Sequence, residues 1–585
     1  MLQALLERPG EIVTRKELQE RLWPADTFVE FENGLNNAIS RLRETLGDSA
    51  DSPRFIDTIP RRGYRFIAPV EPAGQPAPAA REPADAPTAH ATRARKQWFL
   101  TAGLVLAGLV AVIAYRQFNW RNMSINSVAV LPLVTVNVAE GSPDDEYLAF
   151  GLTEALTAEL SKIGALKVIS QTSAMQYKGA QKSLPEIARE LGVGAVVEGS
   201  VVRDENEIRV TVQLIEAATD THLWAETYQR ELRDILTMQT EIARAIAREI
   251  HLTLSPGEQA ALNVARAVNP AAHEAYLRGR YFMQKQTDED VRKALSYFQQ
   301  AIALDPSYAP AYADLSTVYW DFAAGRAPTP QARAKALEDA QTAAQRALAL
   351  DDTLADAHVA KGFLLLHADW DVESAEAAFR RAIALSPSNE TAHGGLGECL
   401  LARGQPQEAL KQAQRAYELS PMTLVSNRGL GNFYLYAGDY DRAIEQLQKS
   451  LEMEPNDPVA RGSLGLAYLQ KGLHQEGLDE FQKVARAAPA DWALASLVYA
   501  HAVTGDRAEA LRILRPVEAR GQAPALEVAI AYAGLGNADK AFAWLQKGFE
   551  QRQIGLVMIQ IMPQLAPLRS DARFARLLEQ MGLQS

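Results

Sequence analysis

A segment near the N-terminus, from Asn33 to Leu46, carries side chains suited to specific hydrogen bonding. Helical spacing places Leu35, Ala38, Ile39, Leu42 and Leu46 on one apolar stripe, and Gly47 ends the predicted helix. The outer face and its flanks present amide, hydroxyl and guanidinium groups: Asn36, Asn37, Ser40, Arg41 and Arg43. Asparagine and arginine can form paired hydrogen bonds with base edges in the DNA major groove. These five residues are therefore candidates for reading DNA.

A basic hairpin follows this helix. The stretches RFIDTI and YRFIAPV predict two strands joined by Pro60-Arg61-Arg62-Gly63, with a glycine to turn the chain. Residues 54–67 hold four arginines and one aspartate, whereas residues 1–70 hold ten basic and eleven acidic residues. The positive charge is therefore concentrated in the hairpin. Arg61 and Arg62 are candidates for phosphate or minor-groove contacts, and Tyr64 completes the predicted DNA-binding set.

These side chains need a scaffold that presents a helix and a hairpin together. Thr14 and Glu17 predict a capping box at the start of a preceding amphipathic helix. In helix-turn-helix proteins the second helix enters the major groove. Two helices followed by a basic hairpin predict a winged helix, an α+β domain over residues 1–70.

The sequences FENGLNNAISRLRETLGD and PRFIDTIPRRGYRFIAPV resemble the winged-helix output domain of OmpR/PhoB-type regulators, in the membrane-anchored subgroup typified by ToxR and CadC. The resemblance implies that the helix from Asn33 to Leu46 reads the major groove and that the tip from Arg61 to Gly63 reaches the minor groove. It also implies a homodimer on promoter half-sites. Family members begin with a small antiparallel sheet and a complete first helix. Met1 falls inside that helix, so we expect either that the true start lies upstream or that the winged helix is truncated and lacks this sheet.

An Ala- and Pro-rich stretch over residues 71–97 predicts an extended linker. Residues 98–115 are uncharged and apolar, which predicts one transmembrane helix. The basic residues Arg93, Arg95 and Lys96 precede it, against Arg116 and Arg121 after it. This bias places the N-terminus in the cytoplasm and the C-terminal region in the periplasm. We therefore expect a single-pass protein of the bacterial inner membrane.

Residues 124–262 alternate strand and helix patterns, which predicts an α/β domain. Strands are expected at SVAVLPLV and LKVIS, and helices at AFGLTEALTAELSKIG, SLPEIARELG and 235–252. The stretch from Ala195 to Ala217 predicts a hairpin that turns at residues 204–206. We expect His222 and Trp224 to pack beneath this hairpin, with a pocket lining as the alternative. The motifs FGLTEAL, KVISQTS and VEGSV resemble the TolB-N-like or FlgO-like domain of such regulators.

Residues 270–585 repeat at the tetratricopeptide period. Turn residues recur at spacings of 46, 35, 34, 34 and 34, at Pro306, Asp352, Pro387, Pro421, Pro455 and Pro489. About eight repeats are expected, with a loop between paired helices expanded around 321–332 and a polar-faced helix closing the array. Such a solenoid offers a concave surface, so we expect an unidentified protein or peptide partner.

Other chemistry has little support. The net charge of −12 argues against a surface that is basic throughout, and the single cysteine, Cys399, excludes an intramolecular disulfide. Histidines show no metal-ligand spacing, and the glycines of GVGAVVEGS precede a strand rather than a helix that could bind phosphate. We predict no catalytic residues, no cofactor, no metal and no enzymatic activity.

The sequence thus predicts a multidomain chain with a winged helix, one transmembrane helix, an α/β domain and an all-α solenoid. The favoured function is a membrane-integrated one-component transcriptional regulator, controlled by a periplasmic region that senses a signal or binds protein. The alternative is a membrane-anchored tetratricopeptide scaffold whose truncated head does not bind DNA.

Overall fold

The computed structural model divides the chain into two units, residues 1–115 and 116–585. The described residues of the first unit are 2–6, 8, 10, 12–14, 16–18, 39, 42–43, 48, 53–59 and 62–68. Those of the second are 125–135, 143–204, 207–250, 252, 254–261, 269–285, 287–327, 329–520 and 523–583. Among helices in these ranges, none combines the length and apolarity needed to cross a bilayer. The linker at 71–97 and the span expected at 98–115 lie outside them.

The first unit is built around a small antiparallel sheet in the order β1-β3-β2. Its elements are α1 (Leu2–Leu6), β1 (Ile12–Thr14), β2 (Ile56–Ile59) and β3 (Gly63–Phe66). The predicted hairpin is confirmed as β2 and β3, with Ile59 opposite Gly63. The predicted capping box is also confirmed, since Thr14 N donates to Glu17 Oε2 at 2.9 Å and Glu17 N donates to Thr14 Oγ1 at 3.2 Å. Strand β1, immediately before this box, was not predicted.

The second unit begins with an α/β domain whose six-stranded sheet has the main order β6-β4-β7-β8-β9. Its strands are β4 (Ser127–Val130), β5 (Val134–Thr135), β6 (Lys167–Val168), β7 (Ala195–Asp204), β8 (Glu207–Glu216) and β9 (Thr221–Glu231). Strand β4 runs parallel to β6 and β7, whereas β7, β8 and β9 form an antiparallel meander. The helical elements are α5 (Pro143–Ser161), α6 (Gln171–Ala174), η1 (Met175–Tyr177), α7 (Leu184–Leu191), η2 (Leu232–Asp234), α8 (Ile235–Glu249) and α9 (Pro256–Ala261).

Two apolar clusters hold this domain together. Side chains of α5 and α8 pack with one face of the sheet, and side chains of α7 pack with the other face. The hairpin of β7 and β8 was predicted, but β9 was missed because most of its side chains are exposed and polar. His222 and Trp224 lie in β9 itself. Trp224 is partly buried against the α5 and α8 cluster, whereas His222 is exposed, so the expected packing of His222 is wrong.

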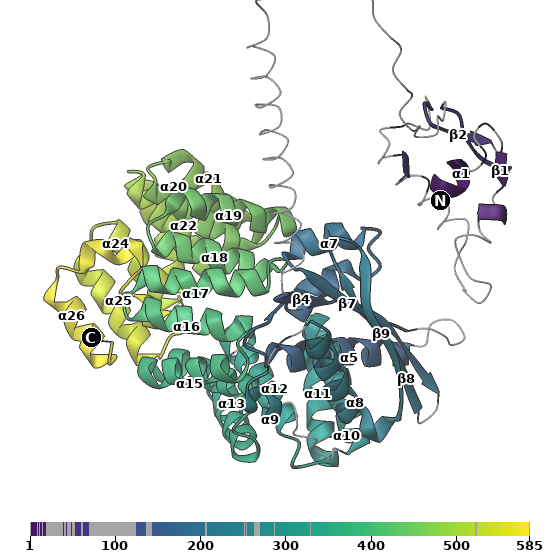
Figure 1. Ribbon diagram of the computed structural model, residues 1–585. Helices are drawn as coiled ribbons and strands as arrows, with labels where there is room; N and C mark the ends of the chain where they lie inside the picture. The colour runs from purple at the N-terminus through teal and green to yellow at the C-terminus, as the bar shows by residue number, and fades with distance from the viewer. Residues whose placement is uncertain are drawn as a thin grey trace, which may run out of the picture. The chain divides into compact units, whose positions relative to one another are not determined.

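Eight successive helix pairs form the described part of the solenoid (Figure 1), which agrees with the expected number of repeats. The pairs are α10 (Pro270–Lys285) with α11 (Asp288–Leu304), α12 (Ala309–Asp321) with α13 (Pro330–Leu350), α14 (Ala355–Leu364) with α15 (Val372–Leu385), α16 (Glu390–Ala402) with α17 (Pro406–Leu419), α18 (Leu424–Tyr436) with α19 (Tyr440–Met453), α20 (Pro458–Gln470) with α21 (His474–Ala487), α22 (Asp491–Val503) with α23 (Arg507–Ala519), and α24 (Ala525–Gly534) with α25 (Ala538–Glu550).

Most of the expanded loop expected around 321–332 is helical. Helix α12 continues into a π-helical segment, η3 (Phe322–Arg326), and α13 then runs for 21 residues. Thr329 caps α13, because its side chain accepts a hydrogen bond from Ala332 N. The additional residues therefore lengthen both helices of the pair. The alanine-rich composition of α13 favours this outcome, because alanine has the highest helix propensity.

Phenylalanines packed against glycines allow the helices to approach closely. Phe379 of α15 is fully buried, and a Cβ atom on Gly395 of α16 would lie 2.3 Å from its ring. A Cβ atom on Gly362 of α14 would lie 2.7 Å from the same ring. The ring of Phe379 therefore fits between α14 and α16 because both helices have glycine at the contact.

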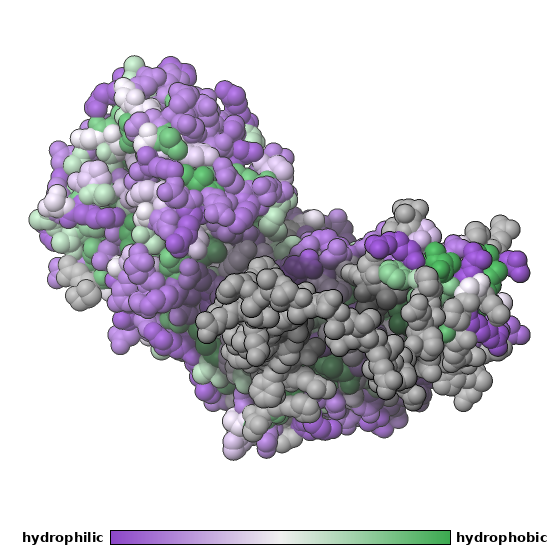
Figure 2. All heavy atoms as spheres, turned by 45° about the horizontal axis from the view of Figure 1, so that its top comes forward, coloured by the Kyte–Doolittle hydropathy of each residue, from purple (hydrophilic) through white to green (hydrophobic). Residues whose placement is uncertain are grey.

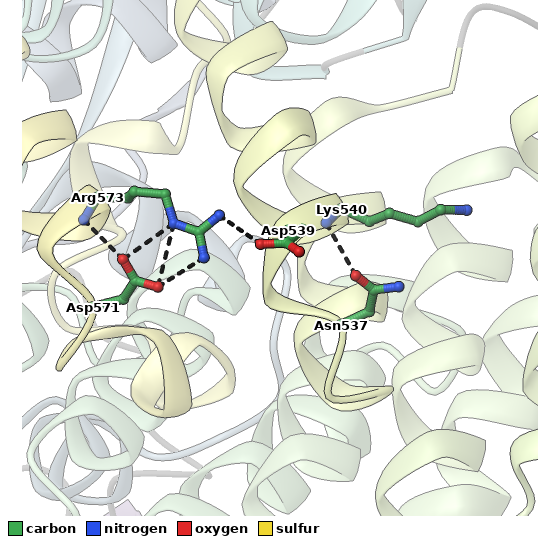
Figure 3. A network of polar contacts seen from close by, with 5 residues as sticks. All are labelled: Asn537, Asp539, Lys540, Asp571 and Arg573. Carbon is green, nitrogen blue, oxygen red and sulfur yellow. Dashed lines mark hydrogen bonds and ion pairs between the residues drawn. The ribbon is translucent and has the colours of Figure 1, made fainter.

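The C-terminal end of the solenoid is closed by η5 (Leu556–Met558), η6 (Pro563–Leu568) and α26 (Ala572–Gln580). Arg573 joins α26 to α25, as Figure 3 shows, because its guanidinium pairs with Asp571 and with Asp539 at 2.8 Å each. Asn537 caps α25 by accepting from Lys540 N at 3.1 Å. The predicted closing helix is confirmed, with Phe574, Leu577 and Leu578 on its buried face.

The α/β domain and the solenoid share a buried interface within the second unit. Ser170 N donates to Leu419 O at 2.7 Å, and the hydroxyls of Ser170 and Ser420 lie 2.8 Å apart. Val168 N donates to Ser388 Oγ at 3.1 Å. These bonds connect β6 and the start of α6 to the turns that follow α15 and α17. The domain and the repeats therefore form one compact unit.

Adjacent glycines in α16 provide a matched test of the packing. Gly394→Ala should raise the thermal midpoint, because a Cβ atom there meets nothing within 4 Å and alanine favours a helix over glycine by about 0.5–1 kcal/mol. Gly395→Ala should lower it, because the methyl group collides with Phe379, and overpacking of this kind costs about 1–3 kcal/mol. Thermal unfolding of the full chain checks both, and shifts of the same sign would contradict the packing described.

A buried histidine gives a second test. His273 of α10 is 5% exposed, its Nδ1 lies 2.9 Å from the Tyr308 hydroxyl, and burial lowers its pKa to about 4. The unfolded chain binds a proton near pH 6.5, so the stability from neutral His273 is present above pH 6.5 and is lost as the pH falls toward 4. Between pH 6.5 and 5 the stability advantage over His273→Gln should shrink by about 2 kcal/mol. Denaturant titrations at several pH values measure this difference, with His222→Gln as the matched control; a constant advantage would refute it.

Candidate nucleic-acid interface

The structure describes part of the predicted recognition set. Asn36, Asn37, Ser40, Arg41 and Arg61 lie outside the described residues, and their contacts with DNA stay predictions. Ile39 and Leu42 are helical, and Ile39 is 2% exposed within the core of the first unit. The buried side of the helix thus agrees with the apolar stripe at these two positions.

Arg43 ties the helix to the hairpin. Its Nη2 atom donates to Ile56 O at 2.8 Å and to Thr58 Oγ1 at 2.7 Å, and the side chain is partly buried. Arg43 was predicted to contact DNA, but its guanidinium is instead engaged with β2. We therefore reassign Arg43 as a residue that positions the helix against the sheet.

Asp48 holds the start of β2, a contact that was not predicted from the sequence. Its carboxylate accepts from Arg54 N at 2.6 Å and from Ile56 N at 2.8 Å. The signal was available, since an aspartate directly after the glycine that ends a helix can satisfy backbone donors of the next segment. Arg43 and Asp48 together fix the base of the hairpin.

Tyr64 is corrected from a DNA contact to a core residue. Its side chain is 2% exposed and packs with Val13, Ile39, Ile56 and Phe66. A side chain buried to this extent cannot reach a phosphate or a base. The neighbouring Gly63 is also required for packing, because a Cβ atom there would lie 2.1 Å from Val13 O on β1.

Arg62 is exposed at the tip of the hairpin, and its contact with DNA stays a prediction. It lies at the hairpin turn, where its backbone N–H donates to Ile59 O at 3.0 Å, and its side chain is exposed. Arg65 differs, because it pairs with Asp57 across the strands at 2.7 Å. The charge of Arg65 is therefore balanced within the sheet, and the available positive charge of the described tip comes from Arg62.

The solenoid already holds other parts of its own chain. Arg333 of α13 donates to Arg552 O at 2.9 Å, and the Arg552 guanidinium stacks 4.8 Å from the Trp370 ring. In the segment that follows Arg552, Leu556, Val557 and Ile559 are fully buried. The segment after α25 therefore packs back onto the second and third helix pairs. A partner of the solenoid must bind beside this segment and the α/β domain, or displace one of them.

No group of three His, Cys, Asp or Glu side chains in the described ranges has the arrangement of a metal site. Cys399 is fully buried, and burial raises the pKa of its thiol well above the ordinary value. These observations give the thiol a packing role. The predicted absence of cofactor, metal and enzymatic activity stays a prediction.

Comparisons with known proteins identify both ends of the chain. Residues 1–66 match the family model described as "Transcriptional regulatory protein, C terminal". Residues 388–456 and 428–491 match two tetratricopeptide repeat models. The chain therefore combines an N-terminal winged-helix domain of the OmpR/PhoB type with C-terminal tetratricopeptide repeats.

Three curated relatives cover different shares of the chain. Transcriptional regulator HilA of Salmonella typhimurium is 24% identical over 415 residues, which are 70% of this chain and 64% of the relative. The cholera toxin homolog transcriptional activator of Vibrio parahaemolyticus is 46% identical over 71 residues, 12% of this chain and 24% of the relative. A putative adenylate cyclase 3 of Rhizobium meliloti is 36% identical over 192 residues, 33% of this chain and 32% of the relative. The chain spans less than two thirds of each.

Among solved structures, YrrB, described as a TPR protein with an unusual peptide-binding site, is similar to part of the chain. The similarity covers 33% of this chain and 92% of YrrB, with 23% identity and a TM-score of 0.25.

Replacing Arg43 or Arg62 by alanine should change the stability of the first unit by different amounts. Arg43→Ala should lower the stability of the first unit by about 1–2 kcal/mol, because Ile56 O and Thr58 lose a charged donor. Arg62→Ala should change stability by less than about 0.5 kcal/mol, because the side chain is exposed at a turn. Hydrogen exchange of residues 53–68 in the full chain, followed by mass spectrometry, measures the difference. Equal protection in both variants would contradict the positioning role of Arg43.

Proposed function

We propose that the chain is a membrane-integrated one-component transcriptional regulator whose N-terminal winged helix binds promoter half-sites. The observation that carries the proposal is the match of residues 1–66 to a transcriptional regulatory domain, together with the exposed Arg62 at the hairpin tip. Arg43 and Asp48 hold the base of this hairpin, and Asn37 and Arg41 are predicted to lie on the helix over residues 33–46. A helix in the major groove and a basic tip on the backbone or minor groove would then bind one half-site together.

The proposal places residues 98–115 across the inner membrane, with the winged helix in the cytoplasm and residues 121–585 in the periplasm. The uncharged span and the basic residues that precede it support this orientation. The α/β domain is proposed to be TolB-N-like or FlgO-like and to act with the solenoid as the controlling region.

Control by a protein or peptide ligand is proposed for the solenoid. Polar side chains dominate the visible face of the helical repeats, with small apolar patches among them (Figure 2). Val425 and Val459 occupy equivalent positions one period apart and are 63% and 48% exposed. A ligand there would contact α18 and α20, and the buried interface would connect the repeats to the α/β domain. Association of two chains would raise the effective concentration of two heads at adjacent half-sites.

Groove reading and phosphate attraction can be separated by two substitutions in the full chain. Arg41→Ala should cost about 1–3 kcal/mol on the promoter and weaken sequence preference. Arg62→Ala should weaken binding to all sequences alike and lower the slope of log K against log salt by about one unit. Binding to the chain's own promoter and to scrambled DNA is measured at several salt concentrations.

Arg233→Ala is the matched control, because Arg233 is exposed but lies in the α/β domain. If the unaltered chain shows no promoter preference and all three variants behave like it, the regulator proposal fails and the membrane-anchored scaffold is favoured.

A further inference from the structure

The two edges of the α/β sheet differ in how their backbone groups are used. At the β6 edge, Val168 N donates to Ser388 Oγ at 3.1 Å, and the same hydroxyl donates to Leu166 O at 3.2 Å. Ser170 N donates to Leu419 O at 2.7 Å. Turns of the solenoid therefore satisfy the outward-facing groups of this edge. The intramolecular interface closes one side of the sheet.

Strand β9 forms the opposite edge. Among the described residues it pairs with β8 alone, and all of its eleven residues except Trp224 and Tyr228 are exposed. Figure 1 shows it on the side of the α/β domain away from helices α15 to α26. The register with β8 is regular from Trp224 to Glu231, because the irregularity lies at Leu214/Ile215. An exposed edge of this length can accept another strand.

The charges of β9 point to a particular partner. Glu226, Tyr228 and Arg230 alternate along the strand and share one face. If two copies of β9 pair antiparallel with Tyr228 opposite its counterpart, each Glu226 lies opposite Arg230 of the other copy. An axis at Glu226 or at Arg230 would instead place like charges directly opposite. Opposite charges across strands stabilise a pair and like charges destabilise it, so the sequence favours the axis at Tyr228.

We propose that β9 is a self-association edge that joins two copies of this chain in that register. Val197 O of β7 accepts from Leu131 N on the β4 side, so the alternating ladder assigns the backbone groups of Tyr228 and Arg230 to β8 and leaves those of Thr227 and Gln229 at the free edge. Arg230 Nη1 donates to Gln229 O at 2.9 Å. In the proposed pair, the Thr227 and Gln229 backbone groups of the two copies exchange hydrogen bonds. Pairing requires Arg230 to leave the Gln229 carbonyl and its ion pair with Glu241 of α8 at 3.0 Å, and Glu226 to leave the Tyr228 hydroxyl at 2.8 Å, so that the two charges meet between the copies. The inference deepens the proposed function by locating the surface through which two copies associate, and its regulatory meaning rests on that function.

Cysteine cross-linking tests the register in the full chain. In a Cys399→Ala background, Thr227→Cys and Gln229→Cys chains are expressed together with different tags. These positions face each other at about 5.5 Å between Cα atoms in the proposed pair, within reach of a disulfide, whereas each variant alone faces its own copy diagonally at about 7–8 Å. The mixed pair should therefore cross-link several-fold more than either variant alone under mild oxidation. Equal yields would overturn the register.

Charge exchange tests the partner. In a Glu241→Gln background, which removes the intrachain partner of Arg230, Arg230→Glu should weaken association about tenfold, because two attractive pairs between the copies become repulsive, and adding Glu226→Arg should restore it. Arg233→Glu makes the same charge change just outside β9 and should have no effect. Sedimentation of the purified full chain over a range of concentrations measures association. A monomer at all concentrations, or failure of the double variant to recover, would overturn the proposal.

Promoter binding by the same preparations separates this inference from the proposed function. Loss of promoter preference with cross-linking intact would count against the regulator and leave the self-association edge standing. Promoter preference without cross-linking would overturn the self-association edge and leave the proposed regulator standing.

Discussion

A partly buried arginine joins the two domains of the second unit. Arg280 of α10 pairs with Glu154 of α5 on one side and with Asp314 of α12 at 2.9 Å on the other. Asp314 is 5% exposed, and burial raises the pKa of Glu154 to about 7 although Arg280 opposes the shift. Two carboxylates of this kind are costly to bury without a cation between them. The position of the α/β domain on the first repeats therefore depends on Arg280.

The solenoid could be predicted from sequence because its packing rule recurs. Each helix pair needs small residues where its helices touch, as at Gly395 against Phe379, and a turn after the second helix. Because these requirements recur in every repeat, the period of 34 residues can be seen in the sequence alone. The extra length before Asp352 was misinterpreted because the period gives the spacing of turns and not the conformation between them. Strand β9 was missed for a related reason. An edge strand whose side chains are mostly exposed shows little alternation of apolar and polar residues.

In the winged helix, the sequence identified the elements better than the roles of single residues. Tyr64 and Phe66 alternate with Gly63 and Arg65, and this period places the two aromatic side chains on the buried face. That signal identifies Tyr64 as core, whereas its position beside a basic tip suggested contact with DNA. The positioning role of Arg43 could not be predicted from the sequence, because its partners on β2 lie 13 and 15 residues away along the chain. Charge alone does not distinguish a residue that contacts a ligand from one that holds the scaffold.

The α/β sheet is the element through which the repeats and a second chain would influence each other. Its β6 edge is bonded to turns of the solenoid, and its β9 edge is exposed. Strands β4, β7 and β8 connect the two edges by continuous pairing, and β4 and the buried face of β7 contribute fully buried side chains to the core. A tightly packed sheet transmits displacement of one edge because its core resists compression. A ligand that shifts the turns after α15 and α17 would therefore change the geometry of β9, and in the proposed regulator this alters how two DNA-binding heads are brought together.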